Sequence, residues 1–221
     1  MEESGMQYGF KGVGRRMQLL RFLILLIGAL SMSCAYSASK TILVLGDSLS
    51  AEYGLARGTG WVPLLQQRLA TEKIAAPIVN ASISGETTSG GLARLPQLLQ
   101  QHHPAVVIIE LGANDGLRGL SLTAAEVNLR TMIDAAQADH AKVLLVGMQL
   151  PPNYGPDYTK KFAAMFGKLA KQSKTALVPF LLAGLEDKPQ LFQADHLHPL
   201  QEAQPILLNN IWPSLKSLLT K

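Results

Sequence analysis

Residues 41–50 of the chain read TILVLGDSLS. The short apolar run at 41–45 ends at a glycine and then at polar residues, a pattern typical of a strand that runs into a tight turn. A strand without polar alternation indicates a parallel sheet covered on both faces. This stretch therefore predicts an α/β fold in which Ser48 projects from the bend at the end of the first strand.

The rest of the chain continues this alternation of short apolar runs with segments of helical period. Further strands are expected at 77–80, 105–111, 142–147 and 176–178, and helices at 60–71, 88–101, 123–139, 158–173 and 200–219. Thr88 and Thr123 are expected to cap two of these helices. The pattern predicts one domain, a three-layer α/β/α sandwich around a five-stranded parallel sheet.

The first forty residues have a different composition from the rest. Arg15, Arg16 and Arg21 precede an apolar run at 22–30 that small residues follow, which is the layout of a secretory signal peptide. The apolar run is shorter than the roughly 20 residues that a membrane-spanning helix needs. We expect a signal peptide over 1–37, with Met17 as an alternative start, and a periplasmic or secreted domain over 38–221 without a stable membrane anchor.

The charge and cysteine content of the mature part exclude some classes of protein. Cys34 is the only cysteine and precedes the expected cleavage, so no disulfide is expected; lipid modification of Cys34 is the alternative. Loss of residues 1–37 removes four positive and two negative charges, so the formal net charge falls from +4 to +2. The remaining chain has no cluster of Lys and Arg with interleaved aromatic residues, and we expect no nucleic-acid partner.

Polar residues follow the expected strands, at the sheet edge where ligands bind in doubly wound folds. Ser48 follows the first strand, and it could be either a helix cap or a nucleophile. A serine nucleophile needs a general base held by an acid. Asp195 and His198 lie three residues apart in the loop segment DHLHP, close enough for the carboxylate to reach the imidazole.

The segment around His198 allows other interpretations as well. It could be a capped loop before the last helix, or a metal site formed by Asp195, His196 and His198. The scarcity of further Cys, His or acidic ligands argues against a metal. Spacing alone leaves both His196 and His198 open as the base.

Hydrolysis of an acyl bond also needs hydrogen-bond donors for the oxyanion of the tetrahedral intermediate. Gly85 follows the second strand, where its N–H can approach a ligand closely. Asn114 offers a side-chain amide after the third strand. Together with the N–H of Ser48 they would form a hole with three donors, although turn chemistry alone could also explain Gly85 and Asn114.

Four motifs together resemble those of the SGNH (GDSL-type) hydrolase family. They are GDSLS at 46–50, Gly85, GAND at 112–115 and DHLHP at 195–199. The stretches 80–85, 90–96, 114–119 and 150–155 are similar to the bacterial periplasmic type with thioesterase, lysophospholipase and arylesterase activities. Glu86 departs from that type, where aspartate is expected, and Gly90 stands where a polar side chain is expected.

The resemblance implies a flavodoxin-like SGNH fold and a serine hydrolase of acyl esters and thioesters, with Ser48 as nucleophile, His198 as base and Asp195 as its partner. It implies an oxyanion hole of the Ser48 N–H, Gly85 and Asn114, and no cofactor or metal. It also implies an acyl groove lined by four residues, namely Leu117, Leu120, Leu150 and Pro151, although each of the three leucines could instead belong to the core. The expected partner is a small-molecule acyl ester or thioester, and we expect a monomer.

Two other functions are compatible with the same residues. A carbohydrate O-acetylesterase of the same family would share the catalytic residues and differ in its groove. A non-catalytic envelope protein that binds lipid would use the same fold without turnover.

Overall fold

The computed structural model describes Met1 and residues 40–220. Apart from Met1, the expected signal peptide at 1–37, with Cys34, lies outside the described residues and stays a prediction. Within the described part of the chain, no helix is both long and apolar enough to cross a lipid bilayer.

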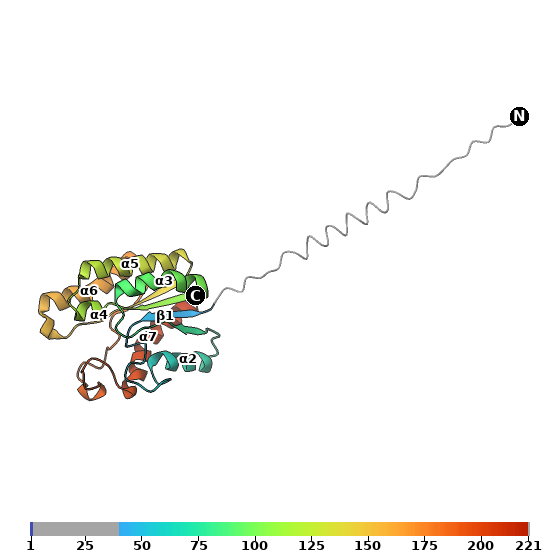
Figure 1. The fold of residues 1–221 in the computed structure, drawn as a ribbon. Helices are drawn as coiled ribbons and strands as arrows, with labels where there is room; N and C mark the ends of the chain where they lie inside the picture. The colour runs from blue at the N-terminus through green and yellow to red at the C-terminus, as the bar shows by residue number, and fades with distance from the viewer. Residues whose placement is uncertain (2–39, 221) are drawn as a thin grey trace. The chain divides into compact units, whose positions relative to one another are not determined.

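The sheet consists of five parallel strands in the order β2-β1-β3-β4-β5 (Figure 1). Their bounds are β1 Ile42–Gly46, β2 Ile78–Asn80, β3 Val106–Glu110, β4 Lys142–Val146 and β5 Ala176–Val178. All five predicted strands are therefore present, with ends that differ by at most one residue. The predicted α/β class with a five-stranded parallel sheet is confirmed.

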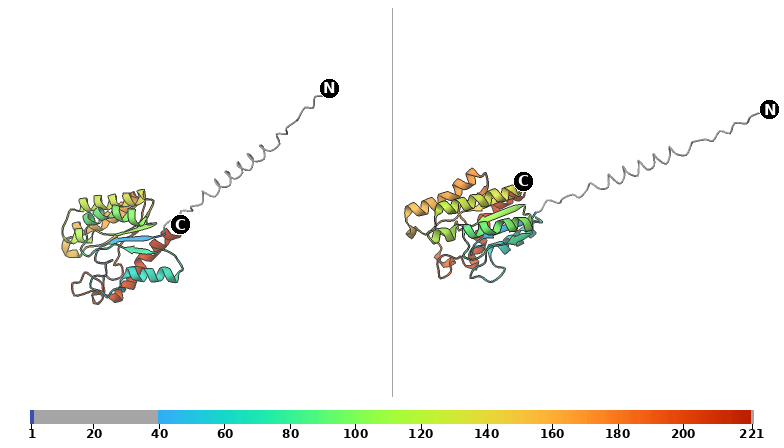
Figure 2. Two further views of the ribbon diagram at one scale, coloured as in Figure 1. Left: turned by 45° about the vertical axis from the view of Figure 1, so that its right-hand side comes forward. Right: turned by 45° about the horizontal axis from the view of Figure 1, so that its top comes forward.

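Helices cover both faces of the sheet, which explains the continuous apolar runs in its central strands. Every residue of β1 and β3 is buried. In Figures 1 and 2, α3, α5 and α6 lie on one face, and α2 and α7 lie on the other. These helices are α2 Trp61–Thr71, α3 Thr88–His102, α5 Leu122–Ala138, α6 Pro156–Gln172 and α7 Gln204–Leu219.

Four short helical segments complete the fold of the described residues, three of them in regions that the sequence predicted as loops. The helix α4 Ala113–Leu117 follows β3 directly, and three 3₁₀ turns are η1 Pro152–Tyr154, η2 Pro189–Leu191 and η3 Gln201–Ala203. The predicted helix at 200–219 is divided accordingly, with η3 before α7. The polar residues after β3 thus lie on a helical turn, which orients them more rigidly than a loop would.

The two predicted helix caps are wrong by one and two residues. Thr87 caps α3 by accepting a hydrogen bond from the Gly90 N–H at 3.3 Å, and Ser121 caps α5 by accepting from the Ala124 N–H at 3.2 Å. Thr88 is instead buried, and its N–H and hydroxyl donate to the Asp115 carboxylate at 2.9 and 2.6 Å. A tertiary contact therefore uses the side chain that the local pattern assigned to the cap.

Candidate active site

The strand β1 ends in a tight turn that presents Ser48. The Asp47 carboxylate accepts a hydrogen bond from the Leu49 N–H at 3.1 Å, and the Asp47 carbonyl accepts from the Ser50 and Ala51 N–H groups. Gly46 is required here, because a Cβ at this position would lie 2.8 Å from Oε2 of Glu110 and from the Ser50 side chain. The absence of a side chain lets the turn pack directly on the end of β3.

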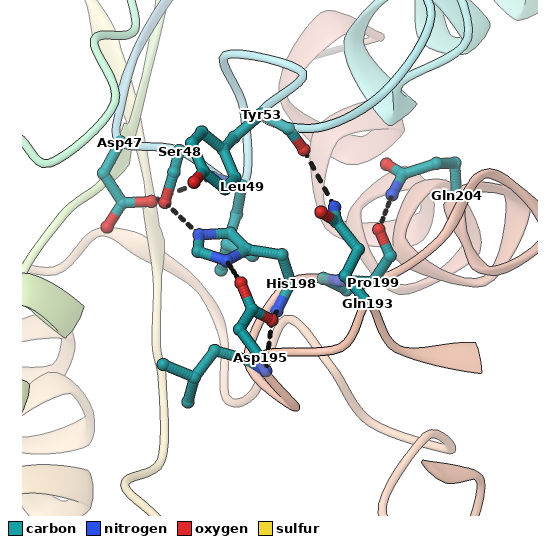
Figure 3. Close-up of polar contacts among 10 residues, drawn as sticks. Asp47, Ser48, Leu49, Tyr53, Gln193, Asp195, His198, Pro199 and Gln204 are labelled. Atoms are coloured by element: carbon teal, nitrogen blue, oxygen red, sulfur yellow. Dashed lines mark hydrogen bonds and ion pairs between the residues drawn. The ribbon is translucent and has the colours of Figure 1, made fainter. Parts of the chain in front are cut away.

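The structure brings Ser48, His198 and Asp195 into one hydrogen-bonded series (Figure 3). Nε2 of His198 lies 2.8 Å from the Ser48 hydroxyl, and Nδ1 lies 2.6 Å from Oδ2 of Asp195. The other carboxylate oxygen, Oδ1, accepts hydrogen bonds from the N–H groups of Leu197 and His198 at 2.9 and 3.0 Å. This arrangement can transfer a proton from the hydroxyl to an imidazole whose far side is held by a carboxylate.

The Asp195 carboxylate is stabilised in its charged form. Partial burial acts to raise its pKa, but the hydrogen bonds from the Leu197 and His198 N–H groups and from the His198 ring together lower the pKa to about 2. Asp195 therefore remains an anion at neutral pH and favours the His198 tautomer that carries its hydrogen on Nδ1. In that tautomer Nε2 is the acceptor facing Ser48.

His196 faces the same cavity but takes no part in this series. Its backbone adopts a left-handed conformation, with φ of 58°, and its N–H donates to the Gln193 carbonyl at 2.9 Å. Across residues 40–220, no three His, Cys, Asp or Glu side chains are grouped as the ligands of a metal ion would be. The geometry pairs His198, and not His196, with Ser48.

The expected oxyanion donors lie beside Ser48, at the ends of β2 and β3. Ser48, Gly85 and Asn114 all line one cavity, and Gly85 adopts φ of 79°, which favours glycine. Nδ2 of Asn114 donates to Oδ2 of Asp47 at 3.1 Å and to the Glu86 carbonyl at 3.0 Å. Because an amide has two N–H hydrogens, a substrate oxygen that binds Asn114 would replace one of these two acceptors.

Glu86 and Gly90 are the two positions at which the sequence differs from the expected pattern, and they are sterically coupled. Oε2 of Glu86 accepts a hydrogen bond from Nε of Arg94 at 2.8 Å, and a Cβ at Gly90 would collide with Oε1 of Glu86. The longer acidic side chain therefore fits because residue 90 has no side chain. The ion pair with Arg94 fixes the segment that leads from Gly85 into α3.

Two buried carboxyl groups, Asp47 in the turn and Glu110 at the end of β3, lie close to Ser48, and the sequence reasoning missed the pair. Oε2 of Glu110 accepts hydrogen bonds from the Ser50 hydroxyl at 2.7 Å and from the Asp47 N–H at 3.3 Å. Burial, together with repulsion from Asp47, raises the pKa of Glu110 well above its usual range. Burial also raises the pKa of Asp47 to about 6, although hydrogen bonds from Leu49 and Asn114 and the charge of His198 oppose the rise. The signal in the sequence was the glutamate at the end of the otherwise apolar run 106–110.

A cavity of about 580 Å³ opens next to Ser48. Leu117, Leu150 and Pro151, three of the four residues expected in the acyl groove, line it. Leu120 does not line this cavity and is 45% exposed after the turn at Gly119. The sequence reasoning missed the apolar wall after β5, formed by Phe180, Leu182, Leu185, Pro189 and Phe192.

Comparison with known proteins agrees with this geometry. The sequence profile of the GDSL-like Lipase/Acylhydrolase family matches residues 44–204. The chain is 54% identical to "Esterase TesA" of Pseudomonas aeruginosa, over 86% of this chain and 95% of that protein. It is 42% identical to "Thioesterase 1/protease 1/lysophospholipase L1" of Escherichia coli, over 82% and 86% of the two chains.

A solved structure extends the comparison to three dimensions. The crystal structure of a TesA protein superposes with a TM-score of 0.79 at 56% identity, covering 80% of this chain and 99% of that one. The predicted resemblance is thus confirmed in sequence and in fold. The chain belongs to the GDSL-like lipase/acylhydrolase family.

Proposed function

We propose that the chain hydrolyses acyl esters and thioesters through an acyl-enzyme intermediate on Ser48. The observation that carries this proposal is the series of contacts from Ser48 to His198 at 2.8 Å and from His198 to Asp195 at 2.6 Å. The names of the relatives, an esterase and a thioesterase/protease/lysophospholipase, support the same class of reaction.

The reaction proceeds in two halves. The Ser48 hydroxyl attacks the acyl carbonyl carbon while Nε2 of His198 takes its proton, and the imidazolium is stabilised by Asp195. The oxyanion accepts hydrogen bonds from the N–H groups of Ser48 and Gly85 and from Nδ2 of Asn114. His198 then gives the proton to the leaving group. In the second half water attacks the acyl carbon, with His198 again as the base. The bond from the acyl carbon to the Ser48 oxygen then breaks, His198 returns the proton to that oxygen, and the acid leaves.

The size and apolar lining of the cavity beside Ser48 favour substrates with acyl groups larger than acetyl. Its lining is mainly apolar and includes Leu117 and Leu150 as well as Phe180 and Leu185, which follow β5. Burial of each additional CH₂ group of an acyl chain contributes about 0.8 kcal/mol. Fatty acyl thioesters, lysophospholipids and aryl esters are therefore the proposed substrates, and a small acetylated sugar would leave most of the cavity unfilled.

We further propose that residues 1–37 direct export and that the domain from residue 38 works as a monomer in the periplasm or outside the cell. The arginines before the apolar run at 22–30 support this proposal. Expression of the full chain in a Gram-negative host, followed by N-terminal sequencing of the exported protein, tests it. A product in the cytoplasm that retains residues 1–37 would contradict it.

Turnover by Ser48→Ala tests the catalytic proposal. The variant should retain the fold and lose activity toward p-nitrophenyl esters of increasing chain length, acyl-CoA and lysophospholipid. Wild-type activity in the variant would refute the role of Ser48. On the same panel, a preference for acetylated sugars would favour the O-acetylesterase alternative. A wild-type protein that binds fatty acid and turns over none of these compounds would favour the non-catalytic one.

A further inference from the structure

The segment that carries His198 is a surface loop closed mainly on itself. Residues 194–197 are exposed, and Phe192 and Pro199 form an isolated antiparallel bridge at the base of the loop. The Gln193 N–H donates to the His198 carbonyl at 2.8 Å, and the Leu200 N–H donates to the Leu191 carbonyl at 2.7 Å. These bonds shape the loop, but they do not fix its distance from the turn that carries Ser48.

The side chain of Gln193 connects the loop to that turn (Figure 3). Its Nε2 donates to the Tyr53 carbonyl at 2.9 Å. Its amide also lies against Gly54, where φ is +70° and where a Cβ would collide with Oε1 of Gln193. The Gln193 side chain therefore bridges the two segments that carry Ser48 and His198. The backbone at Gly54 leaves room for its amide because residue 54 has no side chain.

Tyr53 belongs to the same turn as the nucleophile and contacts the base. The Tyr53 N–H donates to the Ser48 carbonyl at 3.3 Å, and the Tyr53 ring lies 4.5 Å from the His198 ring, centroid to centroid, at an interplanar angle of 43°. The turn is held in place by Glu52, which has φ of 58° and whose carboxylate accepts hydrogen bonds from the Gly58 and Gly60 N–H groups.

We propose that Gln193 and Tyr53 form a clamp that positions the His198 imidazole against the Ser48 hydroxyl. The proposal rests on the proposed function. Gln193 fixes the distance between the loop that carries His198 and the turn at residues 47–54 that carries Ser48. The Tyr53 ring, 4.5 Å from the imidazole ring, limits its rotation, and an aromatic ring at this distance favours the imidazolium that forms in the transition state. Both residues act through His198 and take no part in bond making.

Gln193→Met tests the first half of the clamp, because methionine keeps the length of the side chain and removes the donor. Gln193 does not line the cavity, so a clamp predicts a fall in kcat with little change in KM. We expect kcat to fall between about fivefold and 100-fold, the range from loss of one hydrogen bond to a small misplacement of a catalytic group. The matched control is Gln201→Met, at an exposed glutamine of η3 whose side chain makes no hydrogen bond with the described residues.

Tyr53 provides a second, independent test in case Gln193→Met does not fold. Tyr53 is 50% exposed, so its exchange should leave the fold intact. Tyr53→Phe keeps the ring and should retain several times more kcat than Tyr53→Leu, which removes it. Because Tyr53 lines the cavity, KM is measured as well: with p-nitrophenyl acetate, which fills little of the cavity, the clamp predicts a similar KM in the two variants.

The outcomes separate failure of the clamp from failure of the proposed function. A kcat of Gln193→Met within twofold of that of Gln201→Met would overturn the clamp, as would an effect on KM alone. Equal kcat values for Tyr53→Phe and Tyr53→Leu would also overturn it. In each case wild-type turnover that depends on Ser48 would leave the proposed function standing, whereas absence of wild-type turnover would reject the function itself.

Discussion

Asp195→Asn should reduce activity more than Asp195→Ala, although asparagine is closer in shape to aspartate. Oδ1 of Asp195 is held by the N–H groups of Leu197 and His198 at 2.9 and 3.0 Å, which directs Oδ2 toward Nδ1 of His198. In the asparagine variant only the amide oxygen can accept those two hydrogens, so the amide nitrogen faces Nδ1. The imidazole is then driven to carry its hydrogen on Nε2, where it cannot accept the Ser48 proton.

The expected loss of kcat has two contributions: one that both variants share and one that is specific to asparagine. Both variants lose the charge of the carboxylate, and an ion pair at 4 Å contributes about 1 kcal/mol in water and about 4 kcal/mol at an effective dielectric constant of 20. The Asp195 and His198 side chains are 37% and 20% exposed, so the loss lies between these limits. This loss of interaction energy corresponds to a decrease in kcat of roughly fivefold to 1000-fold, since each 1.36 kcal/mol is a factor of ten.

The asparagine variant has an additional cost from its fixed orientation. Rotation of the amide, which would restore an acceptor to Nδ1, breaks the two hydrogen bonds to the backbone, and each contributes about 1 kcal/mol net. A further 2 kcal/mol or so corresponds to roughly another 30-fold. The assay is kcat with p-nitrophenyl butyrate on variants shown to be folded by circular dichroism. An asparagine variant as fast as the alanine variant, or faster, would refute the orientation argument.

Three further predictions concern the turn and the cavity. Gly46→Ala should lower the free energy of unfolding by about 1 to 3 kcal/mol, measured in urea, because its Cβ would lie 2.8 Å from Oε2 of Glu110 and from Ser50. The raised pKa of Glu110 means that the native state keeps a proton that the unfolded state releases, so stability falls as pH rises above the ordinary carboxyl range. Glu110→Gln should therefore show a smaller loss of stability between about pH 5 and pH 8 than the wild type. Leu117→Asp should lower kcat/KM for a p-nitrophenyl decanoate substrate about tenfold or more relative to the acetate, whereas Leu120→Asp, outside the cavity lining, should not.

A specific result would contradict each of these three predictions. An alanine at position 46 that leaves the urea midpoint unchanged would show that the turn can move away from β3. Equal pH dependence in wild type and Glu110→Gln would show that Glu110 is charged in the native state. Equal effects of the two leucine substitutions would show that the acyl chain lies elsewhere.

The sheet could be predicted because its strands are locally encoded. Runs such as 42–45 and 106–109 are apolar throughout, since both faces of the strand are buried, and turn residues follow them closely. A triad could be proposed because Asp195 lies three residues from His198 in the chain, but the choice of His198 over His196 came from the resemblance to the SGNH family. The five-residue helix α4 was missed because it contains a glycine, an asparagine and an aspartate, which are weak helix formers.

The remaining features depend on residues far apart in the chain. Thr88 is a plausible cap until Asp115 is seen to bind its hydroxyl, and Glu110 is recognised as a partner of Ser50 only in the folded sheet. Gln193 contacts Tyr53 across 140 residues. The cavity wall after β5 has no motif, because any apolar residues of suitable size would form it. Such contacts arise from topology, and a single sequence does not display them.

The rate at which a small fluorophosphonate labels the protein tests the central claim most directly, since the reagent needs only an activated serine. With peptide mapping by mass spectrometry, we predict that the wild type is labelled at Ser48 alone and that His198→Asn is labelled at least about 100-fold more slowly. Labelling at a different serine, or equal rates in the two proteins, would contradict an activation of Ser48 by His198.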